Sequence, residues 1–200
     1  MVAIQDNPVY LNRQLGCLLE RLPMHFPVHT IDSAPADARR AMTASAARLG
    51  HLPDAVAQMA TSPRLLDGFL KMSALFETAT LDQLSREVLI MTVATRNECH
   101  ICIAMHTAKL TDLRADPEVI SALRDQRPLP DPRLAALQEF TLAVLDTAGG
   151  VSDEQLDAFH RHGYTAEQAL EVVLGIGTYT LSTLGNRLTR APLDPALGGP

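Results

Sequence analysis

Clusters of lysine or arginine are absent from this 200-residue sequence, whose 17 basic residues are scattered along the chain. The formal net charge is −6. Proteins that bind nucleic acids or anionic membranes usually gather basic side chains on one surface, because the partner is densely negative. We therefore expect no nucleic acid and no membrane among the partners of this protein.

Cysteine is also scarce, with Cys17, Cys99 and Cys102 as the three examples. Three is too few, and odd in number, for the disulfide framework of a secreted protein. A C-x-x-C pair in a reducing compartment is usually redox-active or metal-binding. Cys17 has apolar neighbours, so we expect it to be a buried, unreactive thiol.

Long apolar runs are missing as well. No window reaches about 18 uninterrupted apolar residues, and the N-terminal stretch has no basic segment leading into an apolar one. These absences argue against a membrane span and a secretory leader. We expect a cytoplasmic protein.

Short runs of alternating apolar and polar residues, which would indicate strands, do not occur either. Apolar residues instead recur at helical spacing, as in RLLDGFLKMSALFETA, and Ser152 and Thr165 precede helical patterns as N-caps. We predict an all-α fold of about seven to nine helices. The predicted organisation is a proline-punctuated extension (1–35), one helical domain (36–190) and a C-terminal tail (191–200).

The chemistry-bearing residues gather in the stretch 82–110, DQLSREVLIMTVATRNECHICIAMHTAKL. Asn97 resembles an N-cap, with a new helical pattern starting at Glu98. Cys99, Cys102 and His106 then fall at i, i+3 and i+7, on one stripe of a helix. Cα atoms three residues apart on a helix lie roughly 5–6 Å apart, within the range of a disulfide, and a helix start favours the thiolate.

Other residues of interest have a plainer interpretation. Spacing alone does not bring in Glu87, which reaches the thiols only if its helix folds back, and which otherwise faces solvent or is paired. Met59, Met72 and Phe76 are expected as core residues, with the wall of a peroxide pocket as the alternative. Three glycines, Gly175, Gly177 and Gly185, suggest close packing of the last long helix.

The run E-x11-C-x2-C-x3-H, from Glu87 to His106, resembles the signature of the carboxymuconolactone decarboxylase superfamily, in its AhpD-like alkylhydroperoxidase (peroxidase-related) branch. Similar flanking stretches, such as MATSPRLLDGFL and LSTLGNRL, extend the resemblance over roughly residues 50–190. The sequence departs from some members at Ile101, where they carry a second histidine immediately before the second cysteine.

The resemblance implies an AhpD-like helical domain that assembles into homo-oligomers, as trimers or hexamers. It also implies an antioxidant, peroxiredoxin-type thiol peroxidase cycle without a cofactor. By this resemblance, Cys102 is the peroxidatic thiol, Cys99 the resolving and more exposed one, His106 the proton relay and Glu87 the base behind it. The expected partners are a hydroperoxide and a thiol or dithiol reductant of unknown identity.

Two alternatives remain open at the level of the sequence. The protein could be a non-catalytic oligomeric redox sensor or binding module, whose thiols switch an interface. Glu87, Cys99, Cys102 and His106 could also offer four ligands to zinc, although structural zinc usually takes more cysteines and catalytic zinc keeps a water.

Overall fold

The computed structural model describes residues 25–193, and these form nine α-helices and no strand, which confirms the predicted all-α class. The helices are α2 (Ala36–Leu49), α3 (Asp54–Met59), α4 (Pro63–Glu77), α5 (Gln83–Arg96), α6 (His100–Asp112), α7 (Pro117–Arg124), α8 (Pro132–Asp146), α9 (Asp153–Arg161) and α10 (Ala166–Thr189). The expectation for Cys17 lies outside the described residues, as do most of the predicted extension and tail. The division at residues 35 and 190 stays a prediction.

Local sequence explains where these helices begin. Ser152 and Thr165 form capping boxes with Gln155 and Gln168, as the patterns before α9 and α10 predict. Three further helices, α4, α7 and α8, begin with a proline after a Ser or Asp whose side chain accepts a backbone N–H. Proline is favoured at this position because its missing N–H would have no partner there.

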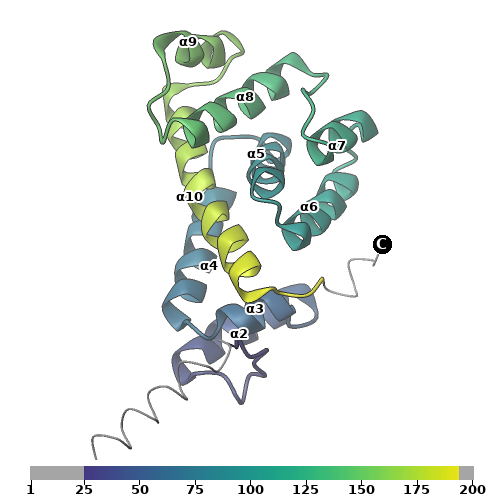
Figure 1. Cartoon of the computed structure of the whole chain (residues 1–200), viewed down its shortest axis with the longest axis vertical. Helices are drawn as coiled ribbons and strands as arrows, with labels where there is room; N and C mark the ends of the chain where they lie inside the picture. Colours follow the sequence, from purple (N-terminus) through teal and green to yellow (C-terminus); the bar gives the residue numbers. More distant parts are fainter. Residues whose placement is uncertain (1–24, 194–200) are drawn as a thin grey trace, which may run out of the picture.

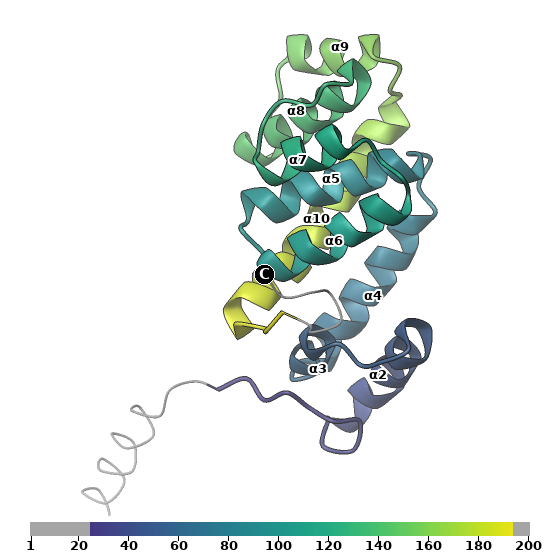
Figure 2. The ribbon, with the colours of Figure 1, turned by 90° about the vertical axis from the view of Figure 1, so that its right-hand side faces the viewer.

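Helix α5 lies at the centre of the fold, with α6, α7, α8 and α10 around it (Figure 1). All of its residues from Glu87 to Thr95 are buried, because neighbouring helices cover it on every side. Helix α4 runs beside α10, and α2 and α3 lie at one end of the molecule, opposite α9 (Figure 2). Between residues 25 and 193, no helix combines the length and the apolar character needed to cross a bilayer.

Gly175 permits the close approach of α10 to α4 and α5. A Cβ atom at this position would lie 2.7 Å from both Leu89 Cδ2 and Phe76 Cε2. Gly177 and Gly185 differ, since a Cβ there would meet its nearest neighbour at 3.7 Å, an ordinary contact. The prediction of close packing is therefore confirmed for the first glycine and wrong for the other two.

Substitution of Gly175 by alanine should lower the free energy of unfolding by about 1–3 kcal/mol, because the added methyl group overpacks a rigid helix crossing. Urea unfolding followed by circular dichroism measures the change. The matched control is Gly177→Ala on the exposed side of the same helix, which should stabilise the protein by about 0.5–1 kcal/mol through helix propensity. Equal effects of the two substitutions would contradict the packing argument.

Candidate active site

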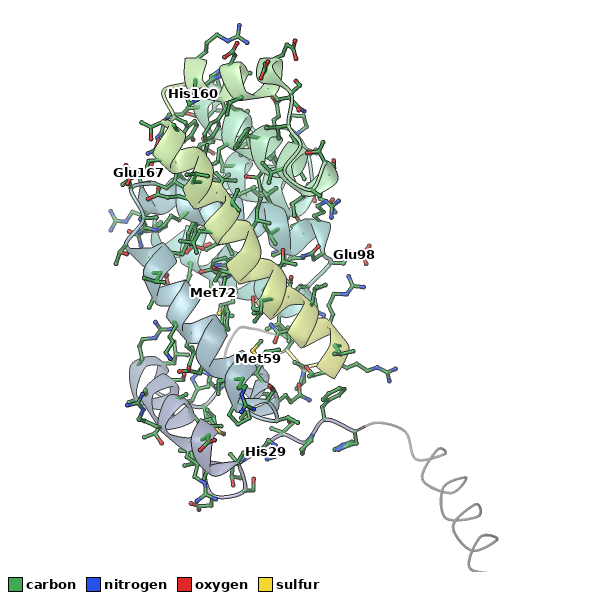
Figure 3. The ribbon with its side chains drawn as sticks, turned by 90° about the vertical axis from the view of Figure 1, so that its left-hand side faces the viewer. His29, Met59, Met72, Glu98, His160 and Glu167 are labelled. Atoms are coloured by element: carbon green, nitrogen blue, oxygen red, sulfur yellow. The ribbon has the colours of Figure 1, made fainter. Side chains whose placement is uncertain are left out.

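The turn between α5 and α6 reverses the chain. The N–H of Cys99 donates to the carbonyl of Ala94 (2.9 Å), and the N–H of Glu98 donates to that of Thr95 (3.0 Å). Together they form a Schellman motif, in which the residue after the helix is left-handed, here Glu98 with φ of 51°. The Glu98 side chain points outward (Figure 3). Helix α6 therefore packs back against α5.

Two details of this turn correct the sequence-based expectation. Asn97 is not the N-cap of the second helix, because it closes α5, and its Nδ2 donates to Thr183 Oγ1 of α10 (2.9 Å). Helix α6 begins at His100 with Cys99 as its N-cap, so the helical pattern does not start at Glu98. The physical reason is that the last carbonyls of α5 need partners, which the backbone of this turn supplies.

The two thiols of the C-x-x-C pair lie in contact and away from solvent. Cys99 and Cys102 are free, and their Sγ atoms are 2.6 Å apart. Cys99 is 1% exposed and Cys102 is 3% exposed, so the expectation that Cys99 would be the more exposed of the two is wrong. Ala55 of α3 and Ala191, just after α10, share the buried apolar cluster around the sulfurs.

Glu87 is brought to His106 by the fold-back of α6. The Glu87 side chain is 7% exposed, and its Oε2 lies 2.6 Å from His106 Nδ1. Its other oxygen, Oε1, is 3.5 Å from Nζ of the half-exposed Lys109. The solvent-facing alternative for Glu87 is therefore excluded, and the predicted pairing of carboxylate and imidazole is present.

The Glu87 carboxylate stays ionised despite its burial. Burial raises the pKa of Glu87, but the hydrogen bond and charge of His106, with a contribution from Lys109, outweigh it and leave this pKa below its ordinary value. A buried carboxylate on Nδ1 fixes the orientation of the imidazole and leaves Nε2 for proton exchange. The edge of the His106 ring packs against Tyr179, with ring centroids 5.6 Å apart.

The two thiols differ in acidity because the Cys102 thiol keeps its proton and donates it in a hydrogen bond to the Cys99 sulfur. The hydrogen bond from Cys102 lowers the pKa of Cys99 to about 7, against the effect of burial, and the backbone N–H groups at the start of α6 lower it further. The hydrogen bond to Cys99, together with burial, raises the pKa of Cys102. The pair therefore loses its first proton at about pH 7, and the resulting negative charge is centred on Cys99.

Asn186 of α10 is a site residue that the sequence did not single out. Its Nδ2 lies 3.5 Å from Cys102 Sγ and 4.0 Å from Cys99 Sγ, so the amide donates toward both sulfurs. Its Oδ1 is buried and has no hydrogen-bond partner within the described part of the chain. A polar amide on the buried face of the last turn of α10 was the available signal, because buried amides are costly unless they are used.

A cavity of about 110 Å³ reaches the reactive residues. Cys102 and His106 line it, whereas Cys99 does not. Met59 also borders the cavity, but it is a buried member of a core cluster with Met42 and Leu66, so its core expectation is confirmed, as is that of Phe76. Met72 stands beside α10 outside the cavity lining (Figure 3). Further lining residues come from α2, α4 and α10, among them Arg48, Phe69, Leu70, Tyr179 and Ser182.

The same four residues do not form a zinc site in this arrangement. Glu87 binds the imidazole of His106, and the two sulfurs face one another, so the four groups do not converge on a common point. Among residues 25–193, no group of three or more His, Cys, Asp or Glu side chains is placed to hold a metal ion.

The fold and the site define a class of protein, an all-helical thiol protein with a buried C-x-x-C pair beside a Glu–His pair. Residues 63–146 match the model of the carboxymuconolactone decarboxylase family. This segment contains α5 and α6 entire. No curated protein matches the sequence.

Several solved structures share the fold. An uncharacterised peroxidase-related protein from Ralstonia eutropha JMP134, an alkylhydroperoxidase AhpD core, has a TM-score of 0.76 and 22% identity over 88% of this chain and 95% of that one. A peroxidase-related protein from Silicibacter sp. TM1040 gives 0.72 and 18% identity, over 88% and 93%. A variant of the debrominase Bmp8 in complex with 2,3,4-tribromopyrrole gives 0.70 and 16%, over 88% and 95%.

Proposed function

We propose that this protein is a thiol-dependent hydroperoxidase, in which Cys102 attacks the peroxide, Cys99 resolves the product, and His106 with Glu87 moves the proton. The observation that supports it is that these groups form a chain of contacts beside one cavity. Cys102 and His106 line the cavity one helical turn apart, Cys99 touches Cys102 from behind, and buried Glu87 holds the imidazole.

The difference in acidity between the thiols gives each a role. Cys102, whose pKa is raised, keeps its proton at rest and needs a base when it attacks. His106 is that base, and Glu87 stabilises the imidazolium that forms. Cys99 needs no base, because its lowered pKa leaves it as the resting thiolate, ready to attack the oxidised sulfur.

The first step breaks the O–O bond of the hydroperoxide. The Cys102 sulfur supplies an electron pair to the terminal oxygen as its own proton moves to His106, and a sulfenic acid forms. The electron pair of the O–O bond leaves with the alkoxide, which takes the proton from His106 and departs as an alcohol. The Asn186 amide, 3.5 Å from Cys102 Sγ, stabilises charge on this sulfur during the attack.

The second step forms the disulfide. The Cys99 thiolate attacks the sulfenic sulfur of Cys102, an S–S bond forms, and hydroxide leaves as water after taking one proton from solvent. Two electrons and two protons from a thiol or dithiol reductant then restore the pair. In total, one hydroperoxide and one dithiol give an alcohol, water and a disulfide.

A titration of free thiols after one equivalent of cumene hydroperoxide tests the proposal. Two of the three thiols per chain should disappear, and peptide mass spectrometry should locate the disulfide between Cys99 and Cys102. A second equivalent should be consumed only after addition of a dithiol. If both thiols are oxidised but no reductant supports turnover, the result favours the redox sensor. If the protein releases bromide from a brominated aromatic and consumes no peroxide, the result favours the chemistry of the debrominase.

We further propose that the protein is a homo-oligomer, a trimer or a hexamer. Helix α10 lies at the surface in the foreground of Figure 3 and exposes large apolar side chains along its length. Those side chains are Leu170, Val173, Leu184 and Leu188, with exposures of 73%, 51%, 55% and 68%. Exposed apolar residues gathered on one helix are typical of a surface that another chain covers. Light scattering of the purified protein measures the assembly.

A further inference from the structure

The charged side chains that line the cavity beside Cys102 are all positive. They are Arg48 at the end of α2 and Lys109 near the end of α6, and no lining residue is acidic. Glu87 lies behind His106 and already binds that imidazole. A cavity with two cations and no anion in its wall attracts a negatively charged group.

Arg48 has no acidic partner within the described chain. No carboxylate of residues 25–193 forms an ion pair with its guanidinium, whereas Lys109 lies 3.5 Å from Glu87 Oε1. The charge of Arg48 nonetheless affects the pKa of Tyr179 in the cavity wall. Burial, together with Glu87 and Glu77, raises the pKa of Tyr179 to about 12, and Arg48 opposes this shift. A guanidinium without a partner binds carboxylate or phosphate through two parallel hydrogen bonds.

Two other lining residues, Cys102 and Asn186, suit a hydroperoxide group. Cys102 supplies the sulfur, and Asn186 presents a buried Oδ1 that has no partner among the described residues. This oxygen can only accept a hydrogen bond, and a protonated hydroperoxide carries one O–H to donate. An acceptor next to the nucleophile therefore favours a substrate with an O–H at its reacting end.

Most of the remaining lining residues are apolar. Met59, Phe69, Leu70 and Met105 contribute aromatic or aliphatic side chains. Lys109 follows Cys102 by seven residues of α6, which corresponds to about 10 Å along the helix axis. The volume of about 110 Å³ suits a small molecule.

We propose that this cavity binds small organic hydroperoxides that carry an anionic group, with the O–OH at Cys102 and Asn186 and the anion at Arg48 and Lys109. The proposal rests on the proposed peroxidase function and specifies its substrate class. The apolar wall excludes water around the body of the substrate, and the two cations set its orientation. Neutral hydroperoxides enter the same cavity but lack this orientation.

A matched pair of substrates tests the proposal, namely cumene hydroperoxide and the same molecule with a carboxylate in the para position. The wild-type protein should have a KM roughly threefold to tenfold lower for the carboxylated molecule. Arg48→Gln should remove that preference by raising KM for the anionic substrate to about the value for the neutral one. Arg48 is the suitable position, because Lys109 also contacts Glu87. Arg64→Gln, at an exposed site outside the cavity, is the control and should change neither KM.

A binding measurement separates this inference from the proposed function. The non-oxidising analogue 4-isopropylbenzoate should bind the wild-type protein more tightly than isopropylbenzene does, and Arg48→Gln should abolish the difference. Equal binding of the two analogues would overturn the inference, even in a protein that consumes peroxides. Preferential binding of the carboxylate by a protein that consumes neither hydroperoxide would support the anion site and overturn the peroxidase function.

Discussion

Replacement of Cys102 by alanine should lower the rate of hydroperoxide consumption at least about 10³-fold, because no other nucleophile of the proposed cycle borders the cavity. Cys99 remains in this variant, but it does not line the cavity and the resting thiolate alone cannot reach the substrate. Stopped-flow measurement of peroxide loss, with the reductant in excess, gives the rate. Urea unfolding confirms that the variant is folded.

The same variant should change the acidity of the thiol that remains. The hydrogen bond from Cys102 is the largest cause of the lowered pKa of Cys99, so its removal should raise this pKa from about 7 toward the ordinary value of a thiol. The pH dependence of iodoacetamide labelling at Cys99, followed by peptide mass spectrometry, reports this shift. A labelling midpoint that stays near pH 7 would show that the backbone of α6 alone sets the acidity.

Cys99→Ser is the matched control, because it removes the partner sulfur and leaves the nucleophile. This variant should consume one equivalent of hydroperoxide and stop, with a sulfenic acid at Cys102 that a dimedone-type probe traps. The opposite pattern, with the sulfenic acid at Cys99 in the alanine variant of Cys102, would reverse the roles. That outcome would mean that acidity, and not access to the cavity, selects the attacking sulfur.

Glu87→Gln should lower the same rate about 10²-fold, because an amide cannot stabilise the imidazolium that forms when His106 takes a proton. Glutamine keeps nearly the volume of glutamate and can accept the hydrogen bond from His106 Nδ1–H, so the packing of α5 is preserved. Single-turnover kinetics isolates the oxidation step from reduction. Glu167→Gln, at an exposed position at the start of α10 (Figure 3), is the control and should leave the rate unchanged. An unaltered rate in the Glu87 variant would show that Glu87 does not assist His106 in the cycle.

Acid titration gives the Glu87 variant a second readout that does not depend on activity. The pKa of Glu87 is lowered in the folded protein from its ordinary value of 4.5. The stability that its ionisation contributes is thus present above about pH 4.5 and is lost as pH falls through the lowered pKa. Glu87→Gln should lack this part of the acid destabilisation in urea unfolding between about pH 5 and 3.

The residues of the site could be predicted from the sequence because they belong to one short stretch and one known signature. Helical spacing placed Cys102 and His106 on one face, and capping patterns located α9 and α10. The pairing of Glu87 with His106 followed only from family resemblance, because a fold-back depends on the turn at Glu98. That turn was misplaced, since a left-handed glutamate carries no sequence signal comparable to glycine.

The cavity and the distribution of charge over the thiols could not be predicted. Both depend on contacts between segments far apart in the chain, such as Arg48 of α2 and Asn186 of α10 around Cys102. The relative exposure of Cys99 could not be predicted for the same reason, because Ala55 of α3 and Ala191 after α10 pack around it from segments that local patterns do not relate to α6. Periodicity reports which face of a helix is buried, and not which segment buries it.

The walls of the cavity have a consequence for how such proteins diversify. The sulfurs and their proton acceptor are held by α5 and α6, inside residues 63–146, whereas Arg48 and Met59 come from the preceding α2 and α3, and Asn186 from the following α10. Part of the cavity wall is thus encoded outside the segment that carries the two thiols and the Glu–His pair. Sequence drift in the outer segments can retune which molecules are accepted while the redox turn is inherited intact.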